Sequence, residues 1–319
     1  MMTSFRTLLK RGLYTCFSLS QHFGFDILPR HFYSEIPDLR VLRKTTSWRK
    51  EYPMSGVNGG GPAGQLAWLK EVLRPDLVKK ALDEKVYEAA CREQGEPGFG
   101  EMDAQVLYCV IHHFQPRRIV QIGCGVTTSV CLKAASDAGY RPVLACIEPY
   151  PSEHLRRLAE TGQITLRAEK MQDVDRAIVE DLEEGDLFFV DSSHTLGPAG
   201  EASRIVLEFL PRLRAGVMIH FHDIHFPYDY GPLIFEGNEG SFFFHHETIL
   251  LLAFLTMNHD FSILASLYQL HIQRTEDLQK LLPNYQPARH QDGVAVSPGH
   301  IPGSIYLKRI HRSTDPGAS

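Results

Sequence analysis

Two short segments of the chain gather carboxylates and imidazoles. One runs from Asp191 to His194 with the sequence DSSH, and the other runs from His220 to His225 with the sequence HFHDIH. A neutral imidazole is suited to accept a proton from a substrate hydroxyl near neutral pH. Mixed carboxylate and imidazole side chains are also ligands for divalent metals. These two segments are therefore the first candidates for a reacting centre.

Each segment follows a short apolar run that is typical of a buried strand. From residue 103 onward, five such runs alternate with helical patterns: RRIVQIG, PVLACIEPY, QITLRAE, DLFFVDSSH and AGVMIHFHD. This alternation predicts a parallel sheet that is covered on both faces. Two later runs, FSILASLYQL and GSIYLKRI, predict an antiparallel pair at the sheet edge. Because the carboxyl ends of neighbouring parallel strands open onto one crevice, we expect the two segments to converge.

Two chemistries fit the converged segments. In one, His194 is a general base beside Asp191 and removes a proton from a substrate hydroxyl. In the other, Asp191, His222 and Asp223 hold a divalent metal, either Mg, Mn, Fe or Zn, and the imidazole favours the transition metals over Mg. Plainer explanations stay open, since DSSH could cap the next helix and His220 could be a buried structural histidine.

A glycine pair lies at the exit of the first strand. In VQIGCGVTTS, Gly123 and Gly125 allow a sharp turn and a close approach of the backbone to a ligand. The second strand ends at Glu148, where a carboxylate can accept both ribose hydroxyls of a nucleoside. Together these residues predict a nucleoside-binding crevice. NAD binding by an oxidoreductase is disfavoured, because Thr128 occupies the third glycine position of the dinucleotide-binding pattern.

A family resemblance accompanies these motifs. RIVQIGCGVTTS, CIEPYP, GDLFFVDSSH, LPRLRAGVMIHFHDIHFPYDYG and GSIYLKR resemble class I S-adenosylmethionine-dependent methyltransferases. More narrowly, they resemble bacterial small-molecule O-methyltransferases of sugar and natural-product pathways, including the metal-dependent macrolide-sugar type. The resemblance implies an α/β, Rossmann-like seven-stranded sheet in the order 3-2-1-4-5-7-6, with the last strand antiparallel. An N-terminal helical extension would precede it.

The resemblance also implies a cofactor and the residues that contact it. The cofactor is S-adenosylmethionine, and its expected contacts are Gln121, Gly123, Gly125, Glu148, Gln172 and Asp191. Gln121 stands where the family usually has Glu or Asp near the ammonium of the cofactor. The family's DxxH segment matches Asp191 to His194, whereas His222 with Asp223 replaces a pair of carboxylates.

Composition and length bound the remaining expectations. The 319 residues carry a net charge of −5, which argues against nucleic-acid binding by bulk charge, and 16 histidines are an excess. We expect an N-terminal extension over 1–100 for substrate or oligomer contacts, a methyltransferase domain over 101–310, and a disordered tail over 311–319. Six cysteines without CxxC spacing and the absence of a long apolar run predict a cytoplasmic protein with no integral membrane span. An apolar and basic first helix would suit a homo-oligomer contact.

The leading hypothesis is thus an S-adenosylmethionine-dependent methyltransferase that acts on a hydroxyl of a small molecule. A metal-dependent enzyme with His and Asp ligands on the same scaffold, catalysing another reaction such as oxidation, is the main alternative. A non-catalytic nucleoside-binding scaffold is the third. Gathering so many ionisable groups in one crevice costs desolvation and repulsion, which disfavours the non-catalytic alternative.

Overall fold

The computed structural model describes residues 5–28, 34, 36–42, 44–45, 50–230, 245–289, 295–296 and 301–310. The chain forms two compact units, Met1–Thr46 and Ser47–Ser319, and each is described by itself. The expected tail over 311–319 lies outside the described residues. Residues 231–244 also lie outside them.

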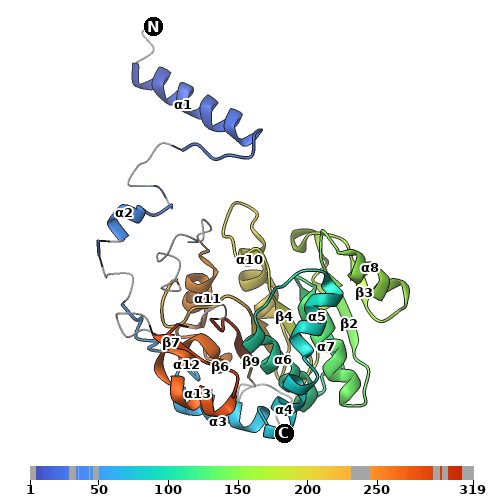
Figure 1. Cartoon of the computed structure of the whole chain (residues 1–319). Helices are drawn as coiled ribbons and strands as arrows, with labels where there is room; N and C mark the ends of the chain where they lie inside the picture. The colour runs from blue at the N-terminus through green and yellow to red at the C-terminus, as the bar shows by residue number, and fades with distance from the viewer. Residues whose placement is uncertain are drawn as a thin grey trace. The chain divides into compact units, whose positions relative to one another are not determined.

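A seven-stranded sheet forms the centre of the second unit (Figure 1). Its strands are β1 (Arg118–Ile122), β2 (Val143–Ile147), β3 (Thr165–Arg167), β4 (Leu187–Val190), β5 (Met218–Phe221), β6 (Phe261–Ser266) and β9 (Ile305–Arg309). They lie in the order β3-β2-β1-β4-β5-β9-β6. The first five pair in parallel, whereas β9 is antiparallel to both β5 and β6. The predicted order and the reversed last strand are confirmed.

Helices cover both faces of this sheet. They are α3 (Pro62–Val72), α4 (Pro75–Asp83), α5 (Val86–Gln94), α6 (Glu101–Phe114), α7 (Val126–Asp137), α8 (Glu153–Glu160), α9 (Ala177–Glu180), α10 (Glu201–Arg204), α11 (Glu247–Leu255), α12 (Leu267–Gln273) and α13 (Thr275–Leu281). Phe188 belongs to one hydrophobic core and its neighbour Phe189 to the other. Because successive side chains of a strand point to opposite faces, the continuous apolar runs fill both cores. A small pair, β7 (Ala288–Arg289) with β8 (Ala295–Val296), stands apart from the main sheet.

Two helical stretches of the second unit are interrupted. The stretch from 65 to 94 forms three helices, because the chain breaks before Pro75 and again at Lys85, whose φ is 50°. The helix after Gly200 is α-helical over only Glu201–Arg204. It continues as a π-helical turn over Ile205–Phe209 and a 3-10 turn over Leu210–Arg212, where Pro211 cannot supply a backbone N–H.

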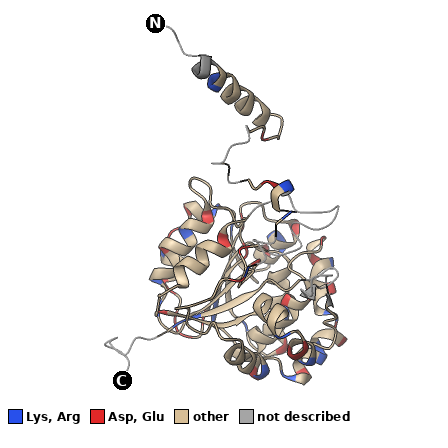
Figure 2. Cartoon of the chain, turned by 90° about the vertical axis from the view of Figure 1, so that its left-hand side faces the viewer, with Lys and Arg blue, Asp and Glu red and all other residues tan. Residues whose placement is uncertain are grey.

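The residues expected to form one N-terminal extension are divided between the two units. The first unit holds α1 (Phe5–Gln21) and α2 (Leu39–Leu42), while α3, α4 and α5 pack into the larger core of the second. None of the described helices is both long and apolar enough to cross a membrane. In the second unit, Lys and Arg residues are interspersed with Asp and Glu residues over the outer helices in the view of Figure 2.

Candidate functional site

The loop after β1 forms the floor of a pocket of about 390 Å³ at the carboxyl ends of the strands. Gly123 in this loop has a φ of +75°, and a Cβ atom there would lie 1.8 Å from the carbonyl oxygen of Asp191. Any other residue would therefore be strained and would collide with the start of the neighbouring loop. The glycine brings the backbone of the first strand directly beside that of the fourth.

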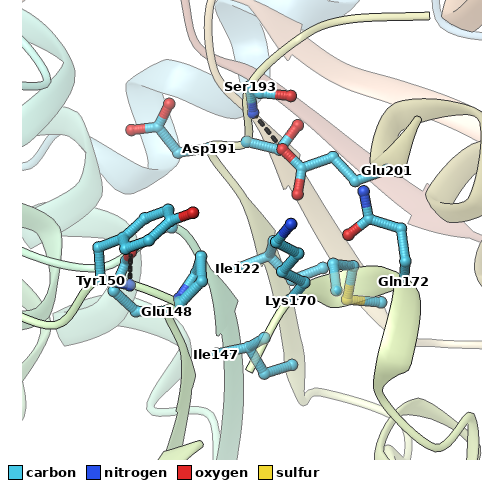
Figure 3. A pocket seen from close by; sticks show the side chains of 13 residues that line it. Ile122, Ile147, Glu148, Tyr150, Lys170, Gln172, Asp191, Ser193 and Glu201 are labelled. Atoms are coloured by element: carbon cyan, nitrogen blue, oxygen red, sulfur yellow. Dashed lines mark hydrogen bonds between the residues drawn. The ribbon is translucent and has the colours of Figure 1, made fainter. Parts of the chain in front are cut away.

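Four of the expected cofactor contacts line this pocket, namely Gly123, Glu148, Gln172 and Asp191. Figure 3 shows Glu148 and Tyr150 on one side of the pocket and Gln172 and Glu201 on the other. The Glu148 carboxylate accepts hydrogen bonds from the backbone N–H of Tyr150 at 2.9 Å and of Cys124 at 3.4 Å. These bonds hold the carboxylate at the strand end, where it can accept the hydroxyls of a ribose.

The two remaining expected contacts differ in their placement. Gly125 lines an adjoining pocket of about 220 Å³, which shares Gly123, Glu148 and Asp191 with the first. Gln121 lines neither pocket, because its side chain is fully buried beneath the loop. Its Oε1 atom accepts a hydrogen bond from the Thr128 hydroxyl at 2.9 Å. The structure thus places Gln121 beneath the glycine loop and outside both pockets.

The two segments rich in acids and imidazoles converge, as their positions after neighbouring strands require. The Nε2 atom of His194 lies 3.6 Å from Asp191 Oδ1 and 3.5 Å from Asp223 Oδ2. The Nδ1 atom of His222 lies 3.4 Å from Asp191 Oδ1 and 3.5 Å from Asp223 Oδ1. Two imidazoles therefore face the same pair of aspartates. Asp191 is common to this cluster and to both pockets.

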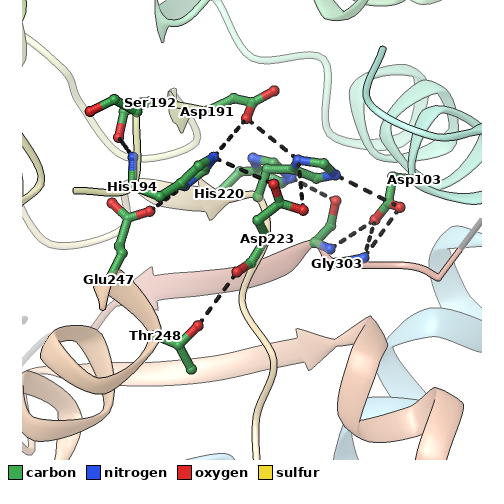
Figure 4. A network of polar contacts seen from close by, with 12 residues as sticks. Asp103, Asp191, Ser192, His194, His220, Asp223, Glu247, Thr248 and Gly303 are labelled. Atoms are coloured by element: carbon green, nitrogen blue, oxygen red, sulfur yellow. Dashed lines mark hydrogen bonds and ion pairs between the residues drawn. The ribbon is translucent and has the colours of Figure 1, made fainter. Parts of the chain in front are cut away.

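A buried carboxylate stands behind each imidazole. The Nδ1 atom of His194 lies 2.6 Å from Oε2 of Glu247, the first residue of α11 (Figure 4). The Nε2 atom of His222 lies 3.9 Å from Oδ2 of Asp103 on α6. Both backing carboxylates are about 1% exposed. Sequence reasoning missed them: Glu247 is the first residue of α11, and Asp103 lies in the first turn of α6, two residues after Glu101.

The backbone at this site is held in an uncommon conformation. His194 has a φ of 59° and Asp223 a φ of 56°, so both lie in the left-handed region although neither is glycine. Such positions cost free energy and persist where surrounding contacts enforce them, which is frequent at functional sites. Here they turn the chain sharply after β4 and β5, and both side chains point into the cluster.

The carboxylates and imidazoles of the cluster stabilise one another in their charged forms. Burial lowers the pKa of His194, but hydrogen bonds to the Asp191 and Glu247 carboxylates outweigh it and raise the pKa to about 10. For His222, burial is likewise outweighed by the Asp223 and Asp191 carboxylates, and its pKa lies well above the ordinary value. Burial would raise the pKa of Asp191, but the two imidazoles hold it well below its usual range. At neutral pH both imidazoles are therefore protonated and Asp191 is ionised.

The metal site expected from Asp191, His222 and Asp223 is not found. Within the described ranges, no group of three or more His, Cys, Asp or Glu side chains is arranged to hold a metal ion. The aspartate oxygens lie 3.4 to 3.6 Å from the ring nitrogens of His194 and His222, so the acids and imidazoles are placed to pair with one another. The carboxylates that would bind the ion are paired with those rings instead.

No histidine of the two segments lines either pocket. His220 is fully buried, stacks on Phe189 with 4.1 Å between ring centroids, and its Nε2 atom lies 2.9 Å from the Ser304 hydroxyl. Burial holds the pKa of His220 well below the ordinary value. This placement is that of a structural histidine. His245, in contrast, lies beside His194, with 5.2 Å between ring centroids.

A family model described as a methyltransferase domain matches residues 120–224. The match covers part of the chain and shows that these residues are similar to a methyltransferase domain. The methyltransferase segment begins within β1 and ends just after β5, so it contains the glycine loop, Glu148 and the converging residues from Asp191 to Asp223. Asp103 and Glu247, the two backing carboxylates, lie outside it. The match does not distinguish the metal-dependent or macrolide-sugar type from other methyltransferases.

Similar proteins extend over more of the chain than this methyltransferase segment. An uncharacterized protein of Archaeoglobus fulgidus is 28% identical over 203 residues, which are 60% of this chain and 88% of the relative. A solved methyltransferase from Geobacter sulfurreducens is 15% identical, with 70% of this chain and 86% of that chain covered and a TM-score of 0.38. The C9 mutein of the branched-chain polyamine synthase of Thermus thermophilus is 14% identical, with 72% of this chain and 64% of that chain covered and a TM-score of 0.43. At these identities and TM-scores the solved structures carry no conclusion about activity.

Proposed function

We propose that this chain is an S-adenosylmethionine-dependent methyltransferase that methylates a hydroxyl group of a small molecule. Besides the match to a methyltransferase domain, one observation of the structure supports the proposal. Asp191 lies at once in the pocket that contains Glu148 and in the cluster that contains His194. A nucleoside cofactor in the pocket and an acceptor at the cluster would therefore meet at one ionised carboxylate.

The pocket fits the cofactor in its chemistry. Glu148 is placed to accept ribose hydroxyls, and Gly123 opens the floor by its missing side chain. The adjoining pocket around Gly125 offers room for the methionine part next to the adenosine part. When bound, S-adenosylmethionine supplies a methyl group on a positively charged sulfur. The ionised Asp191 would favour that positive charge electrostatically.

His194 is the proposed proton acceptor. Its Nδ1 atom is occupied by Glu247, so only Nε2 faces Asp191 and Asp223 in the crevice. In the free protein the imidazole is protonated at neutral pH, because its pKa is raised to about 10. A cation that binds beside Asp191 would compete for this carboxylate and lower the pKa of His194. The base would thus form when the cofactor is bound, and the acceptor's hydroxyl proton would pass to Nε2.

The charge of the surrounding chain bears on the acceptor. Neither 191–203 nor 215–273 contains a single Lys or Arg, although both segments contribute acidic residues to the region of the cluster. An acceptor that carries phosphate or carboxylate groups would find no basic partner from these segments. We therefore propose an uncharged or cationic acceptor, such as a hydroxylated small molecule of a sugar or natural-product pathway.

A metal is not part of the proposal, because the described residues offer no group of three ligands for one. The alternative of a metal-dependent oxidising enzyme and that of a non-catalytic nucleoside-binding scaffold are not favoured by the methyltransferase-domain match. Both alternatives nevertheless make different predictions for binding and turnover. They are separated from methyl transfer by the experiment that follows.

Calorimetric titration with S-adenosylhomocysteine, with and without a chelator, tests the cofactor. We expect equal binding in both conditions, and a protein that binds in neither would contradict the proposal. Loss of binding on chelation would restore the metal hypothesis.

His194→Ala tests the base. It should retain S-adenosylhomocysteine affinity yet lose about 10²–10⁴-fold in turnover, which is what a positioned general base contributes. Turnover is measured as S-adenosylhomocysteine release with an acceptor that the wild type methylates. If the variant keeps full turnover, His194 is not the base.

A further inference from the structure

We infer that Glu247 is a positioning residue for His194, which holds the ring so that Nδ1 carries a proton and Nε2 faces the acceptor. This inference rests on the proposed function for its catalytic meaning. Its geometric evidence comes from Glu247 at the start of α11. This residue lies outside the matched methyltransferase segment, which ends at residue 224.

Glu247 contacts the His194 ring directly. Glu247 Oε2 lies 2.6 Å from His194 Nδ1, a length typical of a charge-assisted hydrogen bond. Neither group is exposed to solvent, since Glu247 is 1% and His194 7% exposed. A buried carboxylate with an imidazole at this distance shares one proton along the line between the two atoms. The ring therefore cannot rotate to exchange its nitrogens without breaking the bond.

No other described side chain competes with His194 for the Glu247 carboxylate. Within the described residues, Oε1 of Glu247 is buried without a hydrogen-bond partner. Burial raises the pKa of this carboxyl, and the His194 hydrogen bond is the largest influence that opposes the rise. An unpaired buried carboxylate costs several kcal/mol. The placement of Glu247 is thus explained by His194 and by no other described side chain.

Two further carboxylates lie on the opposite side of the His194 ring. Nε2 faces Asp191 from the β4 loop and Asp223 from the β5 loop, and the His245 ring lies alongside. Figure 4 shows His194 between Glu247 and the two aspartates. Without Glu247, the two aspartates would draw the proton of a neutral ring to Nε2. The atom that should accept a proton would then already carry one.

¹⁵N NMR of histidine-labelled protein tests this directly, since the ring shifts report which nitrogen is protonated. The His194 signals are identified by their loss in His194→Asn. In the wild type, we expect Nε2 to lose its proton first as the pH rises, with Nδ1 still protonated. In Glu247→Ala, Nδ1 should lose its proton first. Wild-type Nδ1 deprotonating first, or an Ala variant that titrates like the wild type, would overturn the inference.

Two further variants keep the test decisive if Glu247→Ala does not fold. Glu247→Gln retains an oxygen that can accept from Nδ1 but removes the charge, so Nε2 should still titrate first, at a pH lower by about one unit or more. An unchanged titration in this variant would also overturn the inference. Glu208→Gln, at an exposed position that pairs with Arg204, is the matched control and should leave the His194 signals unchanged.

S-adenosylhomocysteine binding separates failure of this inference from failure of the proposed function. The NMR readout needs neither cofactor nor acceptor, so the proton position of His194 can be established even if no cofactor binds. Conversely, the protein could bind S-adenosylhomocysteine while Glu247→Ala leaves the titration of the His194 ring nitrogens unchanged. That result would refute the positioning role of Glu247 and leave the proposed function intact.

Discussion

At the scale of single residues, the site depends on backbone positions that few side chains tolerate. Gly123 and Gly139 have nearly the same φ, +75° and +74°, but different surroundings. A Cβ atom at Gly123 would meet the Asp191 carbonyl, whereas nothing lies within 4 Å of one at Gly139. The pair therefore separates the cost of a left-handed backbone from the cost of a collision.

We expect Gly139→Ala to lower the free energy of unfolding by about 1–2 kcal/mol through backbone strain alone. Gly123→Ala should cost more than this and should also weaken S-adenosylhomocysteine binding, because the loop must move away from Asp191. Urea unfolding and calorimetric titration of both variants provide the comparison. Equal stability of the two variants would mean that the loop adapts freely.

The charge state of His194 predicts how the rate depends on pH. A group that must be deprotonated to act contributes more as the pH rises toward its pKa, which is about 10 in the free protein. kcat/KM should therefore rise with pH across the neutral and mildly alkaline range. kcat should level off at a lower pH, because it reports the complex in which the cofactor's positive charge is bound. A kcat/KM profile that falls over this range would contradict His194 as the base.

At the scale of elements, Asp103 joins the start of α6 to the start of β9. Its carboxylate accepts from the backbone N–H of Ser304 at 2.8 Å and of Gly303 at 3.2 Å, about 200 residues away in the chain. The same side chain lies behind His222. One buried carboxylate thus binds the backbone just before β9, the last strand in the chain, and also lies beside His222 of the cluster.

Asp103→Ala should lower the free energy of unfolding by about 3 kcal/mol, because two buried backbone donors lose their acceptor. Asp83→Ala is the control, since its carboxylate is largely exposed and pairs with Lys79 on the same helix. That change should cost less than about 1 kcal/mol. Denaturant unfolding of both variants measures the difference, and a loss at Asp103 as small as at Asp83 would contradict the tie.

At the scale of the whole molecule, the chain divides after Thr46 into two compact units. All described residues of the candidate site lie in the second unit. The cores on both faces of the sheet are likewise built from residues of this unit. The second unit should therefore contain what is needed for folding and for cofactor binding.

A chain that begins at Ser47 should keep the melting temperature of the large unit and its S-adenosylhomocysteine affinity within about twofold. Thermal unfolding followed by circular dichroism, together with calorimetric titration, checks both quantities. A truncated chain that unfolds at a markedly lower temperature would show that the first unit supports the second. A loss of affinity alone would place part of the first unit at the cofactor pocket.

Sequence patterns were sufficient for the sheet and for the convergence of its two polar segments. Continuous apolar runs with intervening helical patterns specify a covered parallel sheet, and strand order then brings Asp191 beside Asp223. This works because strand period and chain direction are local properties with fixed geometric consequences. The placement of Glu148 at a strand end follows in the same way.

Only the tertiary structure decided which groups pair with which. It placed Glu247 and Asp103, which are 53 and 119 residues from the imidazoles they back, behind the cluster. It also turned Gln121 under the loop and left no metal-binding group of three ligands among the described residues. The physical reason is that burial and the nearest opposite charge set a group's protonation, and neither can be read from residue type.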